Sequence, residues 1–280
     1  MALTEIKAVV LTVATSDIEL ASDALWSLGV VAIEERRISG NSTVCELWTS
    51  LGDDSAEIVA ALQDVHRRWP MRFEFVDPGV SETWRAFAEP TIVDRDVVVY
   101  PAWKARPETS AAYVIAIEPG ATFGMGDHPT TGACIRAMKR IIEQAPGGSM
   151  LDVGCGSGVL AVAACLFGAA QADGIDISPA CVPTTEENAR LNGVATKVRA
   201  STTALRDLPG PYDLVVANIL APTLVELAPG LQRVLSPTGI LIVSGILADN
   251  HAHVLHALAP LVVIANDVQD VWSAITLAAR

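Results

Sequence analysis

The sequence predicts an α/β protein whose larger part is a doubly wound, seven-stranded and mostly parallel sheet, preceded by a small α+β domain. The length of 280 residues, 51% of them hydrophobic, favours two folded domains over one. Beyond residue 112, apolar β-rich runs alternate with helical runs, which is typical of a parallel sheet. Within residues 1–76 the order is instead β-α-β-β-α-β, the ferredoxin-like pattern.

The first domain, residues 1–76, contains no cluster of catalytic residue types, so we expect it to bind or position a partner. Ser16 and Asp17 precede its first helix, and Gly29 ends that helix. The expected elements are strands at 6–13, 30–38, 43–49 and 71–76, and helices at 18–28 and 53–65.

A connector is expected at residues 77–103, because this stretch holds three prolines. It also holds Trp84, Trp103 and a β-rich patch at 93–100. Exposed tryptophans contact partners in some proteins, but they more often pack between domains. The second domain then spans residues 104–280.

The second domain is expected to alternate strands and helices until its last two strands, which follow each other directly and place one antiparallel strand in the sheet. The expected strands are 113–117, 149–153, 171–175, 196–200, 212–217, 240–244, 261–265 and 272–277, and the helices are 132–142, 159–167, 179–191, 222–235 and 250–258. In such sheets ligands bind at the carboxyl ends of the strands.

A glycine-rich turn, residues 151–160 (LDVGCGSGVL), joins the strand 149–153 to the next helix. Gly154, Gly156 and Gly158 allow the backbone to take positive φ and to lie against a ligand. The helix that follows directs its free N–H groups to the same place, so a nucleotide-like ligand is expected. Asp152 before the turn and Asp176 at the end of the strand 171–175 are expected in or near this crevice.

Two ligands fit this turn. Gly156-x-Gly158-x-x-Ala161 with Asp176 twenty positions after Gly156 satisfies the dinucleotide fingerprint, which keeps an NAD-dependent oxidoreductase open. S-adenosylmethionine has no pyrophosphate; it needs a backbone turn beside its amino-acid moiety and a carboxylate for its ribose hydroxyls. Asp152 suits an ammonium group better than a diphosphate, so we favour S-adenosylmethionine.

Asn218 ends the buried strand 212–217, where a methyl acceptor would meet the cofactor. Its side-chain carbonyl can accept a hydrogen bond from an amine and orient the nitrogen lone pair, which makes it the expected catalytic residue. The alternative is an asparagine that caps the next helix. Methyltransferases that act on adenine or glutamine amides have Pro-Pro-Tyr after this asparagine. Ile219-Leu220 stands here instead, which favours an aliphatic amine.

The loop 118–131 contains the run FGMGDHPTT, in which glycines, a proline and hydroxyl residues are concentrated. Pro129 is well placed at the start of the following helix, because its missing N–H would be unpaired there. The segment either caps that helix or closes over a ligand, and its many special residues favour closure.

Five motifs then occur in order and spacing: HPTT at 128–131, LDVGCGSGVL at 151–160, GID at 174–176, ANIL at 217–220 and SGIL at 244–247. Together they closely resemble the PrmA-type bacterial ribosomal-protein methyltransferases, which modify protein eleven of the large-subunit stalk base. The resemblance is strong from about residue 100 through Trp272. The first domain agrees with the family in pattern and size rather than in motifs.

The resemblance implies a class I methyltransferase fold that uses S-adenosylmethionine. By motif, the cofactor contacts are Thr131, Gly154, Asp176 and Asn218, to which we add Asp152, Gly156 and Phe123. The N-terminal domain would hold the ribosomal protein, and a mobile linker would present its lysine and N-terminal amines in turn for trimethylation. Met125 departs from the family, which usually has threonine there, although a flexible thioether can still pack on the cofactor.

The substrate expectation has alternatives. A related group with the same catalytic motifs methylates lysines of the electron-transfer flavoprotein β subunit and usually lacks the full N-terminal domain, so the six-element domain here favours the ribosomal substrate. A non-catalytic binding module is the remaining class, and the intact cofactor motifs argue against it.

Composition sets the expected partners and location. The net charge of −13 disfavours direct nucleic-acid binding and is compatible with a basic protein substrate. The five scattered cysteines never form C-x-x-C, so we expect a reduced cytoplasmic protein without a metal site. No apolar run is long enough for a membrane span, and we expect a monomer.

Overall fold

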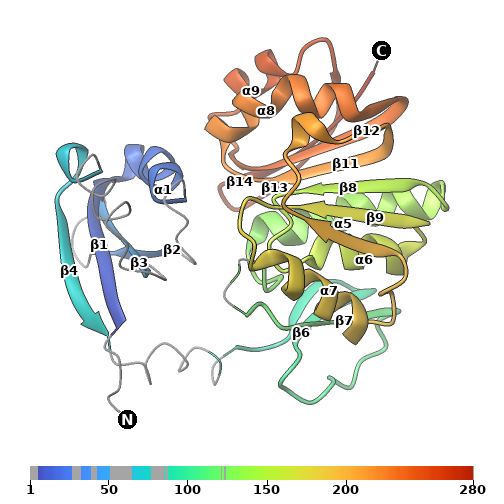
Figure 1. Cartoon of the computed structure of the whole chain (residues 1–280), viewed down its shortest axis with the longest axis horizontal. Helices are drawn as coiled ribbons and strands as arrows, with labels where there is room; N and C mark the ends of the chain where they lie inside the picture. The colour runs from blue at the N-terminus through green and yellow to red at the C-terminus, as the bar shows by residue number, and fades with distance from the viewer. Residues whose placement is uncertain are drawn as a thin grey trace. The chain divides into compact units, whose positions relative to one another are not determined.

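The computed structural model describes residues 6–26, 33–38, 43–50, 65–76, 85, 88–120, 122 and 124–279. The chain divides into two compact units, Met1–Ala88 and Glu89–Arg280. Figure 1 labels the helices and strands of each unit.

The first unit contains a four-stranded antiparallel sheet with the order β2-β3-β1-β4. Its elements are β1 (Ile6–Ala14), α1 (Ile18–Trp26), β2 (Ile33–Arg37), β3 (Val44–Ser50) and β4 (Met71–Val76). Alternate residues of β1, such as Val9 and Leu11, pack with Leu25 of α1 in a fully buried core. This strand order is the ferredoxin-like arrangement. Most of the expected helix at 53–65 lies outside the described residues.

The second unit contains the expected seven-stranded sheet, with the order β10-β9-β8-β11-β12-β14-β13. The strands are β8 (Ser149–Val153), β9 (Gln171–Ile175), β10 (Val198–Ser201), β11 (Tyr212–Asn218), β12 (Leu235–Leu247), β13 (Val262–Gln269) and β14 (Trp272–Ala278). Of the seven strands, β14 alone runs opposite to the other six, so the prediction of one antiparallel strand is confirmed. The strand order reverses between β8 and β11, which is where a doubly wound sheet binds its ligand.

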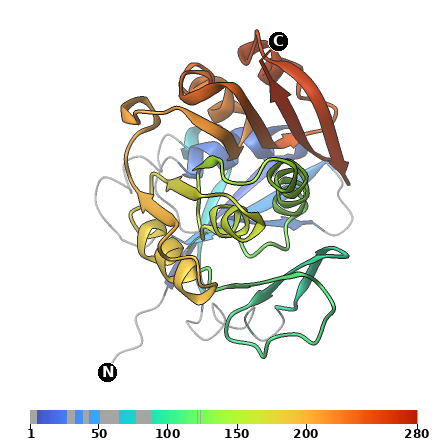
Figure 2. The ribbon, with the colours of Figure 1, turned by 90° about the vertical axis from the view of Figure 1, so that its right-hand side faces the viewer.

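Helices cover both faces of this sheet (Figure 2). One face packs against α5 (Pro129–Gln144), α6 (Val159–Phe167) and α7 (Cys181–Leu191), and the other against α8 (Ala221–Val234) and α9 (Ala252–Ala257). Successive residues of β8 alternate between the two cores, with Met150 on the α5 side and Leu151 on the α8 side. The same alternation places Asp152 and Asn218 on the α5 side of the sheet.

Part of the expected connector is instead a third sheet. Residues 91–101 form β5 (Thr91–Asp94) and β6 (Val97–Pro101), and β6 pairs in parallel with β7 (Tyr113–Ile117). The physical reason is that Val97 and Val99 are buried in the same core as α5, which an extended linker does not allow. Trp103 is half-buried, and Trp84 lies outside the described residues.

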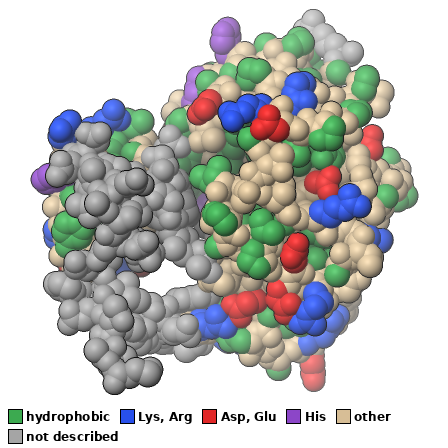
Figure 3. All heavy atoms as spheres, viewed as in Figure 1, with side chains coloured by type: hydrophobic (Ala, Val, Ile, Leu, Met, Phe, Trp, Pro, Cys, Tyr) green, Lys and Arg blue, Asp and Glu red, His purple; other side chains and the backbone are tan. Residues whose placement is uncertain are grey.

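The surface of the second unit is mixed in character. On the face that Figure 3 shows, acidic and basic side chains lie among apolar ones rather than in one large patch. Among the described residues, no helix is both long and apolar enough to span a membrane. The features that distinguish this unit lie at the carboxyl edge of its seven-stranded sheet.

Candidate cofactor and acceptor site

The glycine-rich turn after β8 has the expected conformation. Gly154, Gly156 and Gly158 all have positive φ, at 76°, 53° and 78°. A Cβ at Gly158 would lie 2.5 Å from Cγ2 of Thr185 on α7, so conformation and space both require glycine there. The N–H groups of Gly154 and Cys155 donate to the carbonyl of Ile175, which fixes the turn against the end of β9. The open backbone of the turn therefore faces the switch point of the sheet.

Asp176 is held beside this turn by the backbone. Its Oδ2 accepts a hydrogen bond from the Gly156 N–H at 2.9 Å, and its Oδ1 accepts one from the Ser178 N–H at 2.9 Å. The side chain is half-buried. Each carboxylate oxygen has a second lone pair, so the group is oriented and can still accept two hydrogen bonds from vicinal hydroxyls.

Asn218 and Thr131 meet from different elements. Asn218 ends β11, and its Nδ2 lies 3.5 Å from Oγ1 of Thr131 in the first turn of α5. Thr131 is 1% exposed, whereas Asn218 is half-buried. The N-cap of α8 is Leu220 and no side chain caps this helix, so Asn218 is not the helix cap that the sequence left open. Its amide is therefore available to a ligand at the sheet edge.

Asp152 lies deeper than the sequence suggested. It is 0% exposed on the α5 side of β8, and neither carboxylate oxygen accepts a hydrogen bond of standard geometry within the described part of the chain. Burial raises the pKa of Asp152 to about 7; the Ala161 amide opposes this shift and the charge of Asp176 adds to it. An uncompensated buried carboxylate of this kind is costly, and a cationic group nearby would stabilise its charged form.

The loop before α5 is attached to the glycine turn. The Ser157 hydroxyl donates to the carbonyl of Gly124 at 2.6 Å. Gly124 and Gly126 have φ of 109° and 89°, and His128 caps α5 by accepting from the Thr130 N–H. The loop thus lies beside the turn, as expected of a segment that closes over a ligand. Met125 is half-buried in this loop, and Phe123 lies outside the described residues.

The sequence did not reveal Asn188, which joins three parts of this site. Its Nδ2 donates to the carbonyls of Glu118 and Ser157, and its Oδ1 accepts from the Glu118 N–H. The side chain is 0% exposed on α7. An asparagine within a helical run has no distinctive sequence signal, because its role depends on segments about 30 and 70 residues away.

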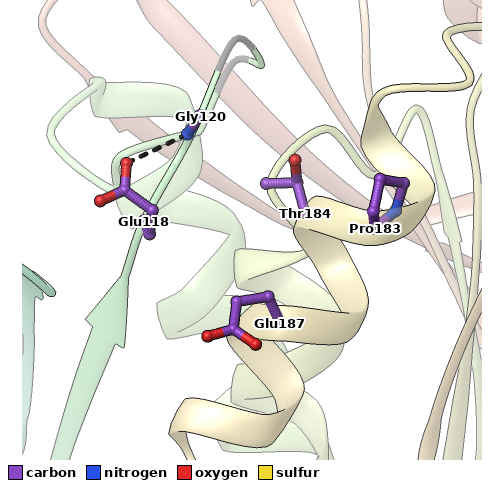
Figure 4. A pocket seen from close by; sticks show the side chains of 5 residues that line it. All are labelled: Glu118, Gly120, Pro183, Thr184 and Glu187. Carbon is purple, nitrogen blue, oxygen red and sulfur yellow. Dashed lines mark hydrogen bonds between the residues drawn. The ribbon is translucent and has the colours of Figure 1, made fainter.

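A shallow cavity of about 220 Å³ lies beside α7 but does not belong to this site (Figure 4). Its lining residues are Glu118, Gly120, Pro183, Thr184 and Glu187. Glu118 accepts a hydrogen bond from the Gly120 N–H, and Glu187 pairs with Arg190. None of the expected cofactor residues lines this cavity. No group of three or more acidic, histidine or cysteine side chains in the described ranges is arranged to hold a metal ion.

Comparison with known proteins identifies the family of this chain. The family model "Ribosomal protein L11 methyltransferase (PrmA)" matches residues 5–280. The chain belongs to the PrmA family. A ribosomal protein L11 methyltransferase of Citrifermentans bemidjiense is 43% identical over 200 residues, which are 70% of this chain and 65% of that protein. One of Symbiobacterium thermophilum is 39% identical over 209 residues, covering 74% of this chain and 68% of that protein.

A solved structure of the PrmA family shares the fold. The ribosomal protein L11 methylase from Lactobacillus delbrueckii subsp. bulgaricus has a TM-score of 0.63 and 31% identity, and the match covers 69% of this chain and 99% of that one. The second unit therefore has the class I methyltransferase fold that the sequence predicted. The match spans about 65% of the length of the first curated PrmA relatives.

Proposed function

We propose that this protein is an S-adenosylmethionine-dependent methyltransferase that acts on lysine and N-terminal amines of ribosomal protein L11. The observation that carries this proposal is the Asn218–Thr131 contact at the carboxyl edge of the sheet, beside the glycine turn and Asp176. Family membership favours methyl transfer over the NAD-dependent oxidoreductase that the glycine spacing alone allowed.

The described residues fit S-adenosylmethionine. The turn at Gly154–Gly158 presents bare backbone for the amino-acid moiety, and the oriented Asp176 carboxylate suits the ribose diol. Neither oxygen of the buried Asp152 carboxylate accepts a hydrogen bond of standard geometry from the described residues, which favours a ligand that carries an ammonium group. We assign the cofactor contacts to Thr131, Asp152, Gly154, Gly156, Asp176 and Asn218, with Phe123 as a sequence-based addition.

When bound, S-adenosylmethionine supplies a sulfonium methyl group, and the S–CH3 electron pair remains on sulfur after transfer to nitrogen. Asn218 has the role of orienting the amine, because its carbonyl oxygen accepts an N–H hydrogen bond and directs the lone pair. A lysine of ordinary pKa, about 10.4, must first lose a proton. Solvent takes that proton, and Asp127 and His128 are the titratable side chains of the nearby loop.

The substrate follows from the relatives and from the first unit. The PrmA relatives are named ribosomal protein L11 methyltransferases. We propose residues 1–76 as the substrate-recognition domain, 77–103 as the segment containing the linker and 104–280 as the catalytic domain. A basic ribosomal protein complements a chain of net charge −13. We further propose a cytoplasmic monomer that does not bind nucleic acid directly.

The test is transfer of labelled methyl groups from S-adenosylmethionine to separately purified L11 and electron-transfer flavoprotein. We expect label on L11 alone, on lysine and N-terminal amines in mass spectra. Label on the flavoprotein alone would retain the chemistry and replace the substrate. A protein that binds the cofactor and labels neither would contradict the proposed substrate class.

Asp176→Ala is expected to weaken cofactor binding on the order of 10- to 100-fold, because two hydrogen bonds from the ribose to a charged group are lost. The measurement is a calorimetric titration with S-adenosylhomocysteine. The matched control is Glu186→Ala, which removes an exposed carboxylate from α7 and should leave the affinity unchanged. Unchanged affinity in Asp176→Ala would show that the ribose is bound elsewhere.

A further inference from the structure

Trp272 lies at the same edge of the sheet as Asn218 although it begins a strand. Because β14 runs antiparallel to β12, its first residue lies where β11 and β12 end. The ladder aligns Asn218 with Ser244 and Ser244 with Ala274. Trp272 precedes Ala274 by two residues, so it shares the face of Asn218. It lies two strands across the sheet from Asn218 and about 7 Å further toward the open edge.

The ring of His128, at the start of α5, contacts the ring of Trp272. The two ring centroids are 5.3 Å apart with an interplanar angle of 63°, an edge-to-face contact. His128 caps α5, and Thr131 three residues later contacts Asn218. The His128–Trp272 pair is thus connected to the Asn218 amide through the first turn of α5.

Packing in the buried core does not explain why a tryptophan is present at position 272. Ser273, Ala274, Ile275, Thr276 and Leu277, the next five residues of β14, are all buried. Trp272 and His128 are only half-buried, so neither residue is fully enclosed by the core. A large, partly exposed aromatic residue at the rim of a site is typical of a contact for a ligand.

We propose that Trp272, held by His128, forms the wall of the acceptor pocket beside Asn218 and binds the substrate amine through its aromatic face as that amine becomes cationic. This inference rests on the proposed methyl transfer. As the new N–CH3 bond forms and the S–CH3 pair stays on sulfur, the nitrogen acquires positive charge, which an aromatic face stabilises. The proton of the product ammonium leaves to solvent before the next transfer.

The surrounding charges suit a cationic amine. Burial lowers the pKa of His128, although the nearby Asp127 opposes this shift, and a lowered pKa favours the neutral form of the ring that holds Trp272. Asp127 is exposed at the same loop and attracts a protonated lysine toward the rim. A methylated ammonium is more weakly hydrated than ammonium itself, and aromatic surfaces recognise such cations, so the same wall serves successive transfers.

The test compares Trp272→Phe, which keeps an aromatic face, with Trp272→Leu, which keeps apolar bulk alone. We expect kcat for L11 methylation to fall about 10-fold in the leucine variant and less than about 3-fold in the phenylalanine variant. The affinity for S-adenosylhomocysteine should remain within about 2-fold in both. The matched control is Val271→Ala, which changes an exposed neighbour and should leave all values unchanged.

A binding measurement separates this proposal from the proposed function. Titration of the protein with Nε-trimethyl-lysine amide, in the presence of S-adenosylhomocysteine, should show binding that weakens about 10-fold in Trp272→Leu but not in Trp272→Phe. If neither L11 nor the flavoprotein accepts methyl groups but the binding of Nε-trimethyl-lysine amide still depends on an aromatic residue at position 272, the proposed role of Trp272 is retained and the proposed substrate is wrong. Equal behaviour of the leucine and phenylalanine variants in both assays, or a loss of cofactor affinity in both, would overturn the proposal.

Discussion

Asn218→Ala is expected to lower kcat for methyl transfer about 100-fold while it changes the cofactor dissociation constant less than about 3-fold. The amide lies at the end of β11 with its Nδ2 3.5 Å from Oγ1 of Thr131, and no helix cap occupies it. Its loss removes the group that orients the amine lone pair, and that interaction matters most when the N–C bond forms. Steady-state kinetics with L11 and a separate calorimetric titration measure the two quantities.

The control for this experiment is Asn266→Ala, which removes an exposed amide from β13 on the outer edge of the same sheet. It should match the unchanged protein in both measurements. Equal losses of kcat and of cofactor affinity in Asn218→Ala would instead make Asn218 mainly a cofactor contact. A large loss of affinity with unchanged kcat would remove it from the acceptor site altogether.

Much of the fold could be predicted from the sequence because the patterns that indicate strands and helices are local. Alternating apolar and helical runs predicted the parallel sheet and the antiparallel last strand, and both are confirmed. Part of the expected connector, 91–101, forms a strand pair because β7 and α5 cover its short β-rich patch. Its stability depends on residues distant in sequence, which a local pattern does not contain.

The candidate site likewise contains features that the sequence predicted and features that it did not. The positions of Gly154, Asp176 and Asn218 followed from their places at strand ends, since parallel strands end at one edge. The depth of Asp152 did not follow, because a strand end gives no information about which layer of helices covers a side chain. The contact between His128 and Trp272 joins residues 144 positions apart, and no spacing rule relates them.

In the ligand-free protein, Asp152→Asn is expected to change the free energy of unfolding, relative to that of the unchanged protein, more favourably at pH 8 than at pH 5. Burial raises the pKa of Asp152 to about 7, above its ordinary value of 3.8. A raised pKa means that the folded state binds this proton more tightly than the unfolded state does. The stabilisation is complete below about pH 4 and is lost as the pH rises to about 7, where the folded protein must ionise a fully buried carboxyl group.

Asparagine has no proton to lose, so the free energy of unfolding of Asp152→Asn lacks this pH-dependent loss. From pH 5 to pH 8, the difference between variant and unchanged protein should shift in favour of the variant on the order of 3 kcal/mol. Urea unfolding at both pH values measures it, and any fixed cost of burying the amide cancels in the comparison. The control is Val215→Ala on the neighbouring strand, which removes buried volume from the α8 side of the sheet, away from Asp152, and should have the same effect at both pH values. A pH-independent difference for Asp152→Asn would show that the carboxylate is already compensated in the folded protein, and the case for an ammonium-bearing ligand beside it would lose its electrostatic basis.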